Sequence, residues 1–516
     1  MKQLEVLDYL KLNGWQRFLY NLKCFFCGIP GWFVNLCKKI GRWVKKAGIA
    51  IWENLKDLYF TFVKGKWQTK VSFLIMGFGS LCYGQALRGV LFLLFEIVFV
   101  LYMVFWGGSW LSLFGSLGKT PLQSDVYDPV KDTYTDIPGD DSFKILLYGL
   151  LSIAFIIALA YTWRLQIKQC RINEEIMAMG KKVKSTKDDM KSLLDNQYHK
   201  TLLALPVTGI MIFTVIPIIF MILVAFTNYN AVDADGYKNL FHWVGLDNFN
   251  QLVNFATDIP GKKSFAVTFG EVLGWTLMWA VFATFTNYFL GMFVAMMINK
   301  KGIQFKKGFR TILVMTIAIP QFISLLYVSK MFAYNGIINN VLQNLGIIKQ
   351  AIHFMDDQAS PHLARAMVIL INIWIGIPYL MLIATGILMN IPQDLYESAK
   401  IDGASGVQQF GKITLPYMLF VTGPYLLTSF TGNLNNFNVI FLLTGGAPIK
   451  TDASTVGGTV GDTDLLITWL FNMTTGVSGK YYLASVIGIM IFIVVAVLSL
   501  IVYNVMPSNK NEGDFS

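Results

Sequence analysis

The feature that most constrains this chain is a series of eight apolar segments, each about as long as a bilayer is thick. A membrane-spanning helix needs roughly 20 apolar residues. Segments of about this length occupy residues 86–106, 144–163, 202–226, 273–298, 309–330, 364–390, 413–435 and 481–506. Of the 516 residues, 54% are hydrophobic and only 14% are charged, a balance that soluble chains rarely show. The sequence therefore predicts an all-α integral membrane protein with about eight spans.

The charges between these segments predict the orientation of the chain. Lys and Arg collect in the cytoplasmic loops of membrane proteins. Residues 1–70 hold 13 Lys and Arg against four acids, and residues 299–310 hold five basic residues and no acid. Acids outnumber bases in the loops at 107–143 and 227–271. This alternation predicts a multi-pass protein of the cell membrane with both termini in the cytoplasm.

The N-terminal residues form a region of their own. Trp32, Leu36 and Trp43 recur at helical spacing with basic residues between them, a pattern that suits the inner membrane interface. Calmodulin-like partner binding uses the same pattern and stays an alternative. The run Val71–Cys82 is too short to span, so we expect it to be interfacial or re-entrant. Three regions result: a basic amphipathic region at 1–70, two N-terminal transmembrane helices with a cytoplasmic linker at 71–200, and a core at 201–516.

Several other classes of protein receive no support from the sequence. The pair Cys24 and Cys27 lacks the second pair or nearby histidines that a zinc site needs, so we expect no metal. No GxxxxGK[ST] loop is present to cradle a nucleotide. The net charge of +11 does not indicate nucleic acid, because membrane proteins carry basic residues on the cytoplasmic side. Lys11 and Arg17 interrupt the first apolar stretch, which argues against a signal peptide.

Charges are missing from the interiors of the predicted spans between residues 202 and 506. Ion-coupled carriers usually place ionisable residues at membrane depth, so this pattern disfavours an ion-coupled carrier and indicates a neutral solute. Glu96, within the first span, is an exception. Because an isolated carboxylate is costly in lipid, we expect Glu96 to face protein or to lie near the interface. A functional role for this carboxylate stays open.

Amides and aromatic rings are concentrated in the stretch SFTGNLNNFN at residues 429–438. An amide both donates and accepts hydrogen bonds, as a sugar hydroxyl does, and an aromatic face offers a sugar a flat apolar surface. Asn433 and Asn436 are three residues apart and would share a helix face, so they could converge on one ligand. The same amides are equally suited to bonding neighbouring helices or a helix end. Prolines at 217, 320, 378, 416 and 424 fit a wet pathway and a static bundle of bent helices equally well.

One polar stretch between the sixth and seventh segments, YESAKIDGASGVQQFGKITLP at 396–416, has a more specific pattern. On composition alone it would be an ordinary connection between two helices. It nevertheless resembles the EAA motif of ABC-importer permeases. The matching residues are Glu397, Ser398, Ala399, Asp402, Gly403, Ala404, Ile413, Leu415 and Pro416, with Ser398 in place of the usual Ala.

Further stretches narrow the resemblance to MalF-type permease subunits of maltose and maltodextrin importers. They are WVGLDNF at 243–249, IWIGIPYLML at 373–382, NNFNVIFLLTGGAP at 435–448 and TDLLITWLF at 463–471. The resemblance covers roughly residues 200–506. It implies a six-helix type I ABC importer permease core. The loop at 227–271 is too short for the large external domain of some members.

The resemblance also implies site residues. It assigns substrate contacts to Ile375, Gly376, Tyr379, Gly432, Asn433 and Asn436, although Gly432 stands where an aromatic residue is expected. It assigns coupling to an ATPase subunit to Glu397, Ser398, Ala399, Asp402, Gly403 and Ala404. In this family the EAA segment is a pair of short helices that dock on the ATPase. Gly403 would allow the bend between them.

By this resemblance the chain is expected to be a non-enzymatic permease subunit for maltodextrin-like oligosaccharides. The implied partners are a second, MalG-like permease, two ATPase subunits, an extracellular solute-binding protein and membrane lipid. The chain is expected to bind no cofactor, since ATP and Mg²⁺ would belong to the ATPases. Alternatives are a permease for a raffinose-type sugar or a polyol, an ion-coupled secondary carrier, and a membrane scaffold without cargo.

Overall fold

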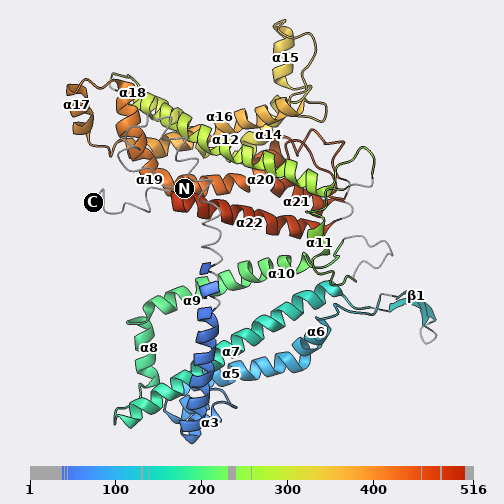
Figure 1. Cartoon of the computed structure of the whole chain (residues 1–516), viewed down its shortest axis with the longest axis vertical. Coiled ribbons are helices and arrows are strands. Elements are labelled where there is room, and N and C mark those ends of the chain that lie inside the picture. Colours follow the sequence, from blue (N-terminus) through green and yellow to red (C-terminus); the bar gives the residue numbers. More distant parts are fainter. Residues whose placement is uncertain are drawn as a thin grey trace. The chain divides into compact units, whose positions relative to one another are not determined.

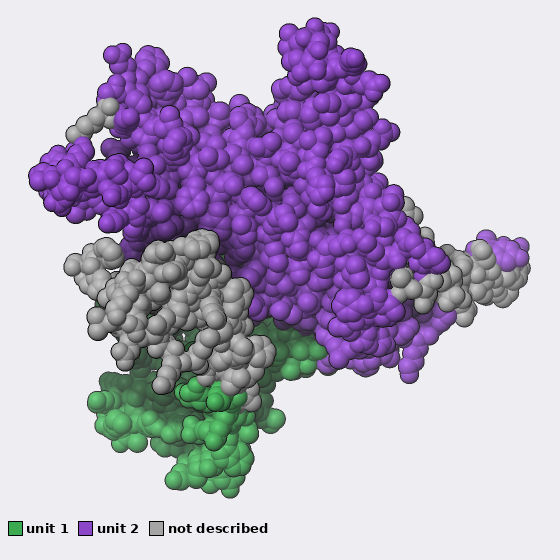
Figure 2. All heavy atoms as spheres, turned by 45° about the horizontal axis from the view of Figure 1, so that its top comes forward, with its two compact units in different colours: residues 1–109, 152–208 green, residues 110–151, 209–516 purple. Residues whose placement is uncertain are grey.

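The computed structural model describes residues 38–39, 41–43, 45–121, 123–128, 132–137, 139–230, 240–256, 259–300, 302–454, 456–476 and 479–505. The chain divides into two compact units, which Figure 2 colours separately. Unit 1 comprises residues 1–109 and 152–208, and unit 2 comprises residues 110–151 and 209–516. Cys24, Cys27, Trp32 and Leu36, which the sequence analysis names, lie outside the described residues.

Unit 1 is helical in its described part. A helix covers residues 45–64 and is followed by the short helices α3 (Trp67–Val71) and α4 (Phe78–Cys82). Next, α5 (Ala86–Tyr102) continues through a π-helical turn (Met103–Gly107) into α6 (Gly108–Leu113), whose residues from Trp110 onward belong to unit 2. The second half of α7 (Ser142–Ala178), then α8 (Thr186–Leu194) and most of α9 (Tyr198–Ile210), complete the unit. The broken run between α3 and α4 agrees with the expectation that Val71–Cys82 does not span.

Glu96 faces protein, as expected from its cost in lipid. Its Oε2 accepts a hydrogen bond from the backbone N–H of Met76 at 2.8 Å, beside Gly77, whose φ is +83°. The Gln166 side chain supports the same turn, accepting from the Gly77 N–H and donating to the Ser72 carbonyl at 2.6 Å. Irregular backbone next to apolar helices needs such partners. In this structure Glu96 therefore stabilises the turn between α3 and α4.

Unit 2 contains the remaining elements. The strands β1 (Gln123–Asp128) and β2 (Thr133–Ile137) form an antiparallel hairpin that the sequence did not predict. The helices are α10 (Ile216–Val224), α11 (Asp247–Asn250), α12 (Phe265–Asn299), α13 (Lys306–Ala318), α14 (Gln321–Met331), α15 (Ile337–Asn344), α16 (Pro361–Leu388), α17 (Gln393–Ile401), α18 (Gly406–Gln409), α19 (Leu415–Leu434), α20 (Phe437–Leu443), α21 (Leu466–Thr475) and α22 (Tyr481–Val505). π-Helical turns precede α10 (Met211–Val215) and α19 (Phe410–Thr414).

Seven of the eight predicted spans are helices long and apolar enough to cross a membrane. The predicted span at residues 309–330 is a bent pair of helices, which together pass the same test of length and composition. This segment forms α13 and α14, which meet at an angle of 91°. Proline explains the break, because Pro320 has no N–H to donate and disfavours helical backbone at the preceding residue. Ile319 accordingly has an extended conformation (φ −83°, ψ 124°).

The core of unit 2 lies along α12, which packs against α16 over most of its length (Figure 1). Trp275, Trp279 and Ala283 of α12 are buried with Val368 of α16 and Leu325 of α14. Further along α12, Tyr288 and Met292 pack against Leu380, and Met418 of α19 joins them. In Figure 1, α17 and α18 lie at the opposite end of unit 2 from α11 and the start of α12.

Candidate functional site

A cavity of about 400 Å³ lies within unit 2, between α12, α16, α19 and the bend that joins α13 to α14. Helical periodicity explains which side chains reach it. On α16, Asn372, Gly376 and Tyr379 lie on one face, and on α19 Ser429 and Asn433 lie one turn apart. Among the described residues that line the cavity, none is Asp, Glu, Lys, Arg or His. The cavity is therefore polar and uncharged.

The bend between α13 and α14 forms one wall of the cavity. Ile319 and Pro320 line it, together with Gln321 and Ser324 from the first turn of α14. Broken helices at membrane depth occur where the freed backbone faces protein or a wet cavity. The break at Pro320 has such a setting here. At this proline, the interpretation of the helix breakers as part of a wet pathway therefore has better support than a static bundle of bent helices.

Asn433 and Asn436 meet in the cavity, but not because they share a helix face. Helix α19 ends at Leu434, and Asn436 instead caps α20, accepting from the Val439 N–H at 3.4 Å. The Asn436 amide donates to Asn433 Oδ1 at 3.2 Å, and the Asn433 amide donates to Thr284 on α12 at 3.0 Å. The structural interpretation is therefore confirmed, since these amides bond neighbouring helices and a helix end, while their place in the cavity wall keeps ligand binding as a prediction.

Gly376 lets α12 and α16 approach closely at the cavity. A Cβ atom added at Gly376 would lie 2.3 Å from Nδ2 of Asn287, far inside van der Waals contact. The Asn287 amide therefore occupies the space that any larger residue at position 376 would need. This contact is long-range and cannot be read from the GIP stretch in the sequence.

Two buried amides in the cavity wall have hydrogen-bonding capacity that is not used. Oδ1 of Asn287 and Nδ2 of Asn372 have no hydrogen-bond partner among the described residues. These asparagines are 7% and 6% exposed. A buried polar group without a partner costs free energy, so such groups are uncommon and call for an explanation. Both atoms are sealed inside the cavity wall with almost no exposed surface, although the two residues line the cavity.

Five of the six residues predicted to contact substrate line this cavity: Ile375, Gly376, Tyr379, Asn433 and Asn436. Gly432 is not among the lining residues, and a Cβ added there would meet no described atom within 4 Å. Sequence reasoning missed Asn287 and Tyr425. An asparagine within an otherwise apolar predicted span was the available signal for Asn287. Only the fold brings the Tyr425 ring within 6.4 Å of the Tyr379 ring.

The stretch resembling the EAA motif forms a second candidate site. As expected, it consists of two short helices, α17 and α18, with a turn at residues 402–405. Gly403 has φ +77°, a left-handed conformation that strains residues with a side chain. Ser405 caps α18 in a capping box with Gln408, and the Tyr396 hydroxyl lies 2.8 Å from Thr414 Oγ1. These bonds make the elbow (residues 393–414) a defined structure that continues into α19.

The elbow exposes apolar side chains together with its charges. Ile401 is 87% exposed and Val407 is 81% exposed, while Glu397 and Asp402 are also at the surface. Ser398 and Gly403 are exposed, and Ala399 and Ala404 are half-buried. Exposed apolar groups rimmed by polar residues are typical of interaction sites. Ile401 and Val407 belong to this surface, although the sequence reading did not select them.

At the other end of unit 2, the loop between α20 and α21 is tied to the helices by polar groups. Lys263 forms ion pairs with Glu271 and Asp452, and hydrogen bonds to these two carboxylates raise the pKa of Lys263. Asp464 is buried, and burial raises its pKa to about 6 although hydrogen bonds from Gly461, Thr468 and Asn472 act in the opposite direction. These contacts fix the loop independently of the elbow.

The chain is similar to known proteins over most of its length. Residues 287–509 match the family model described as "Binding-protein-dependent transport system inner membrane component". The chain is 35% identical to the maltodextrin transport system permease protein MalC of Streptococcus pneumoniae over 83% of this chain and 93% of that one. It is 31% identical to the maltodextrin transport system permease protein MdxF of Bacillus subtilis, over 88% and 99% of the chains. It is also 31% identical to the galactooligosaccharides transport system permease protein GanP of Bacillus subtilis, over 85% and 97%.

Proposed function

The chain belongs to the family of binding-protein-dependent transport system inner membrane components, and from this premise we propose that it moves maltodextrin-like oligosaccharides across the cell membrane as one permease subunit of an ATP-driven importer. The observation that carries the cargo proposal is the uncharged polar cavity between α12, α16 and α19. A charged solute would need a counter-charge there, whereas a neutral sugar needs donors, acceptors and flat apolar surface.

We assign the cargo contacts to the cavity wall. The Tyr379 ring, which is half exposed and has Tyr425 as its neighbour, offers a surface for a pyranose ring. Asn433 and Asn436 each keep amide capacity beyond their mutual bond, and Ile375 and Gly376 shape the wall. Oδ1 of Asn287 is sealed in the cavity wall, and a turn of its amide toward the cavity would let it accept a bond from a sugar hydroxyl. The cavity volume lies within the roughly 300–1,000 Å³ typical of ligand pockets.

The elbow is the proposed contact with an ATPase subunit. Its exposed Ile401 and Val407 would be buried in the partner, and Glu397 would meet a basic residue there. Because the elbow is continuous with α19, which carries Asn433, movement of the elbow would reach the cargo cavity. ATP binding by the partner would shift the equilibrium between outward-open and inward-open states, which is alternating access.

The proposed assembly follows from this arrangement. The chain supplies one elbow, and a second, MalG-like permease would supply another for two ATPase subunits. ATP and Mg²⁺ would be bound by the ATPases and not by this chain. The family description supports a solute-binding protein as the donor of cargo. We further propose that both chain termini and the elbow face the cytoplasm.

Uptake by the reconstituted importer tests the cavity. Tyr379→Ala should lower the uptake of labelled maltodextrin roughly tenfold, because the ring surface is lost. ATPase association should be unchanged, since Tyr379 lines the cavity and is not part of the elbow, which begins at residue 393. Unchanged uptake in this variant would show that the cavity assignment is wrong. Normal uptake by Asn436→Ala would instead favour the scaffold without cargo.

A charge reversal tests the elbow. Glu397→Lys should uncouple ATP hydrolysis from uptake while leaving the protein folded and inserted. Wild-type uptake together with wild-type stimulation of the ATPase would contradict a docking role. Transport by the purified chain in vesicles without any ATPase would favour an ion-coupled carrier.

A galactooligosaccharide is the second candidate cargo, because GanP of Bacillus subtilis is similar over most of its length. Raffinose-type sugars and polyols belong to the same neutral class. Binding of each sugar to the cognate solute-binding protein separates them. Gly432→Phe adds a ring where the chain leaves open space, so a changed order of preference among these sugars would indicate that the space beside Asn433 selects the cargo.

A further inference from the structure

The helix at residues 45–64 in unit 1 has its apolar side uncovered. Ile51, Leu55, Tyr59 and Phe62 follow each other at intervals of three or four residues, and all are between 48% and 66% exposed. At about 100° per residue they occupy one side of the helix, together with Trp52. This exposure matches that of the leucines on α5, a candidate span, which are 46–56% exposed at positions 87, 91 and 94.

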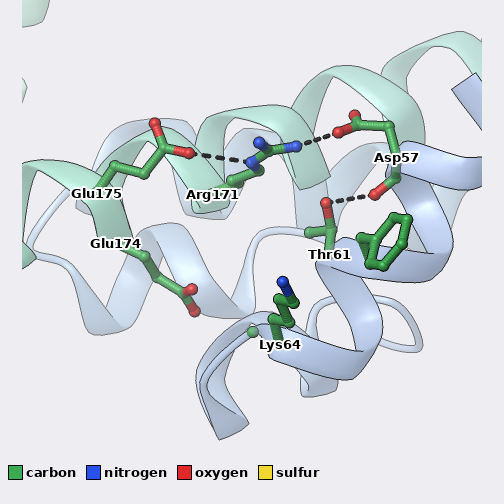
Figure 3. Close-up of a pocket in the computed structure, with 8 residues that line it drawn as sticks. Asp57, Thr61, Lys64, Arg171, Glu174 and Glu175 are labelled. Atoms are coloured by element: carbon green, nitrogen blue, oxygen red, sulfur yellow. Dashed lines mark hydrogen bonds and ion pairs between the residues drawn. The ribbon is translucent and has the colours of Figure 1, made fainter. Parts of the chain in front are cut away.

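The polar side of the same helix contacts α7. Arg164 donates to Asp57 at 2.6 Å and to Asn54 at 3.3 Å, and Arg171 forms a second ion pair with Asp57. Figure 3 shows Arg171 between Asp57 and Glu175, with Thr61 beside them. Burial alone would raise the pKa of Asp57, but Arg164 and Arg171 outweigh it and hold the pKa below its usual value. The helix therefore turns its polar side toward protein and its apolar side outward, the reverse of a helix on a soluble domain.

The contact with α7 sets the depth of this helix. Arg164 is the first charged residue after the apolar part of α7, so Asp57 is bound at the level where that span ends. Trp163, one residue earlier, donates from its ring nitrogen to the Phe73 carbonyl at 3.1 Å, and tryptophan is typical of the membrane–water boundary. The helix itself carries Glu53, Lys56 and Asp57 near its middle, which is too many charges for a span.

Two lysines of this helix point to the kind of membrane surface: Lys56 borders the apolar side, and Lys64 lies on the α7 side, where it lines a pocket with Asp57 and Glu174 (Figure 3). The amines of Lys56 and Lys64 lie 5.4 Å and 5.5 Å from the ring centres of Trp52 and Phe60. Neither amine forms an ion pair with a carboxylate of the described residues. Long lysine side chains that follow aromatic surface toward a charged headgroup are typical of interfacial helices. Lys66 and Lys70 add to the same end of the helix.

We propose that the helix at residues 45–64 lies in the membrane interface, with its apolar side in the acyl chains and its lysines on the phosphates of anionic phospholipids. Helix α7 holds it there through Asp57. The bilayer, and not another protein chain, covers the apolar side of this helix. The proposal concerns unit 1 and is independent of the cargo carried by unit 2.

Spin labels on the full chain in lipid nanodiscs test the location. Single cysteines at Ile51, Leu55 and Phe62 are compared with cysteines at Lys46 and Glu53, in a background whose five native cysteines are serine. We expect the first set to collide with oxygen and the second set with a water-soluble nickel complex. Access of nickel to all five positions would overturn the proposal. Loss of access to both reagents at Ile51, Leu55 and Phe62 would also overturn it, because a protein would then cover them.

Hydrogen exchange on the unmodified chain tests the lipid, and it does not depend on the cysteine variants. Exchange of residues 45–64 should be roughly tenfold slower in phosphatidylglycerol than in phosphatidylcholine nanodiscs, since each lysine near an anionic surface adds to binding. Lys56→Glu with Lys64→Glu should abolish this difference. Lys181→Glu with Lys182→Glu, exposed in the loop after α7, is the matched control and should preserve it. Equal exchange in the two lipids, or protection by free inorganic phosphate, would contradict the anionic surface.

Discussion

The cavity and the elbow of unit 2 use polar residues in opposite ways. In the cavity, the amides of Asn287 and Asn372 are buried and keep unused hydrogen-bonding atoms. In the elbow, Ser405, Gln408 and Tyr396 bond within the segment, and apolar Ile401 is left exposed. The cavity has buried polar groups without hydrogen-bond partners, and the elbow has apolar side chains exposed at the surface. The cavity suits a polar ligand that it encloses, and the elbow suits a protein partner that buries its apolar side chains.

This difference predicts that variants at the two sites fail in separable ways. The largest effect is expected at the elbow. Ile401→Asp with Val407→Asp removes two exposed apolar side chains, each worth about 1.5–3 kcal/mol when buried by a partner. We expect uptake to fall roughly 100-fold and co-purification of the ATPase to be lost. Sugar binding by the detergent-purified permease should persist.

The matched control for this change is Ile347→Asp. Ile347 is 65% exposed but lies after α15, away from the elbow in the chain. Uptake in this control should stay near wild type. If Ile347→Asp lowers uptake as much as the elbow variant does, exposed apolar residues of unit 2 have a general role in membrane insertion. The elbow would then have no specific role in docking.

The next effect is expected in the cavity. Gly376→Val places a side chain where the Asn287 amide already lies at 2.3 Å, and overpacking of this kind costs about 1–3 kcal/mol. Uptake should fall roughly tenfold or more. Gly386→Val, on the same helix, meets no described atom within 4 Å and should be tolerated. Association with the ATPase should be normal in both variants. Loss of association in Gly376→Val alone would show that the two sites are not separable.

A smaller effect should follow from Asn287→Ala. The variant removes an acceptor that the fold does not use, so we expect the apparent KM for oligosaccharide to rise roughly fivefold. Thermal stability should be unchanged or higher, because a buried polar atom without a partner is removed. Thr286→Ala, at the neighbouring position of α12, serves as the control. A fall in stability without a change in KM would indicate a purely structural amide.

The smallest effect on uptake is expected at Asp464, whose polar contacts are satisfied within unit 2. Its pKa is raised from 3.8 to about 6. A raised pKa contributes stability that is present below about pH 4 and is lost as the pH rises through about 6. The thermal midpoint of Asp464→Asn relative to wild type should therefore increase between pH 4 and pH 7 by a few degrees. A pH-independent difference would contradict the burial of this carboxyl group.

The sequence was informative where the signal is local. The apolar segments, the two short helices of the elbow and the left-handed Gly403 follow from hydropathy and from residue types at adjacent positions. The meeting of Asn433 and Asn436 was expected, but for a reason that the helix end at Leu434 overturns. Pro320 was recognised as a helix breaker in the segment 309–330, but the sequence did not give the size of the bend, which is 91°.

The sequence by itself determined that this chain has membrane-length apolar helices and two short helices that form the elbow, since both properties depend on which residue types are neighbours in the chain. Only the tertiary structure decided which amides share a cavity. Asn287, Asn372 and Asn433 come from three helices, and their approach depends on Gly376 and on the break at Pro320. Packing between distant helices is set by side-chain volume and shape, and no period in the sequence records which faces meet.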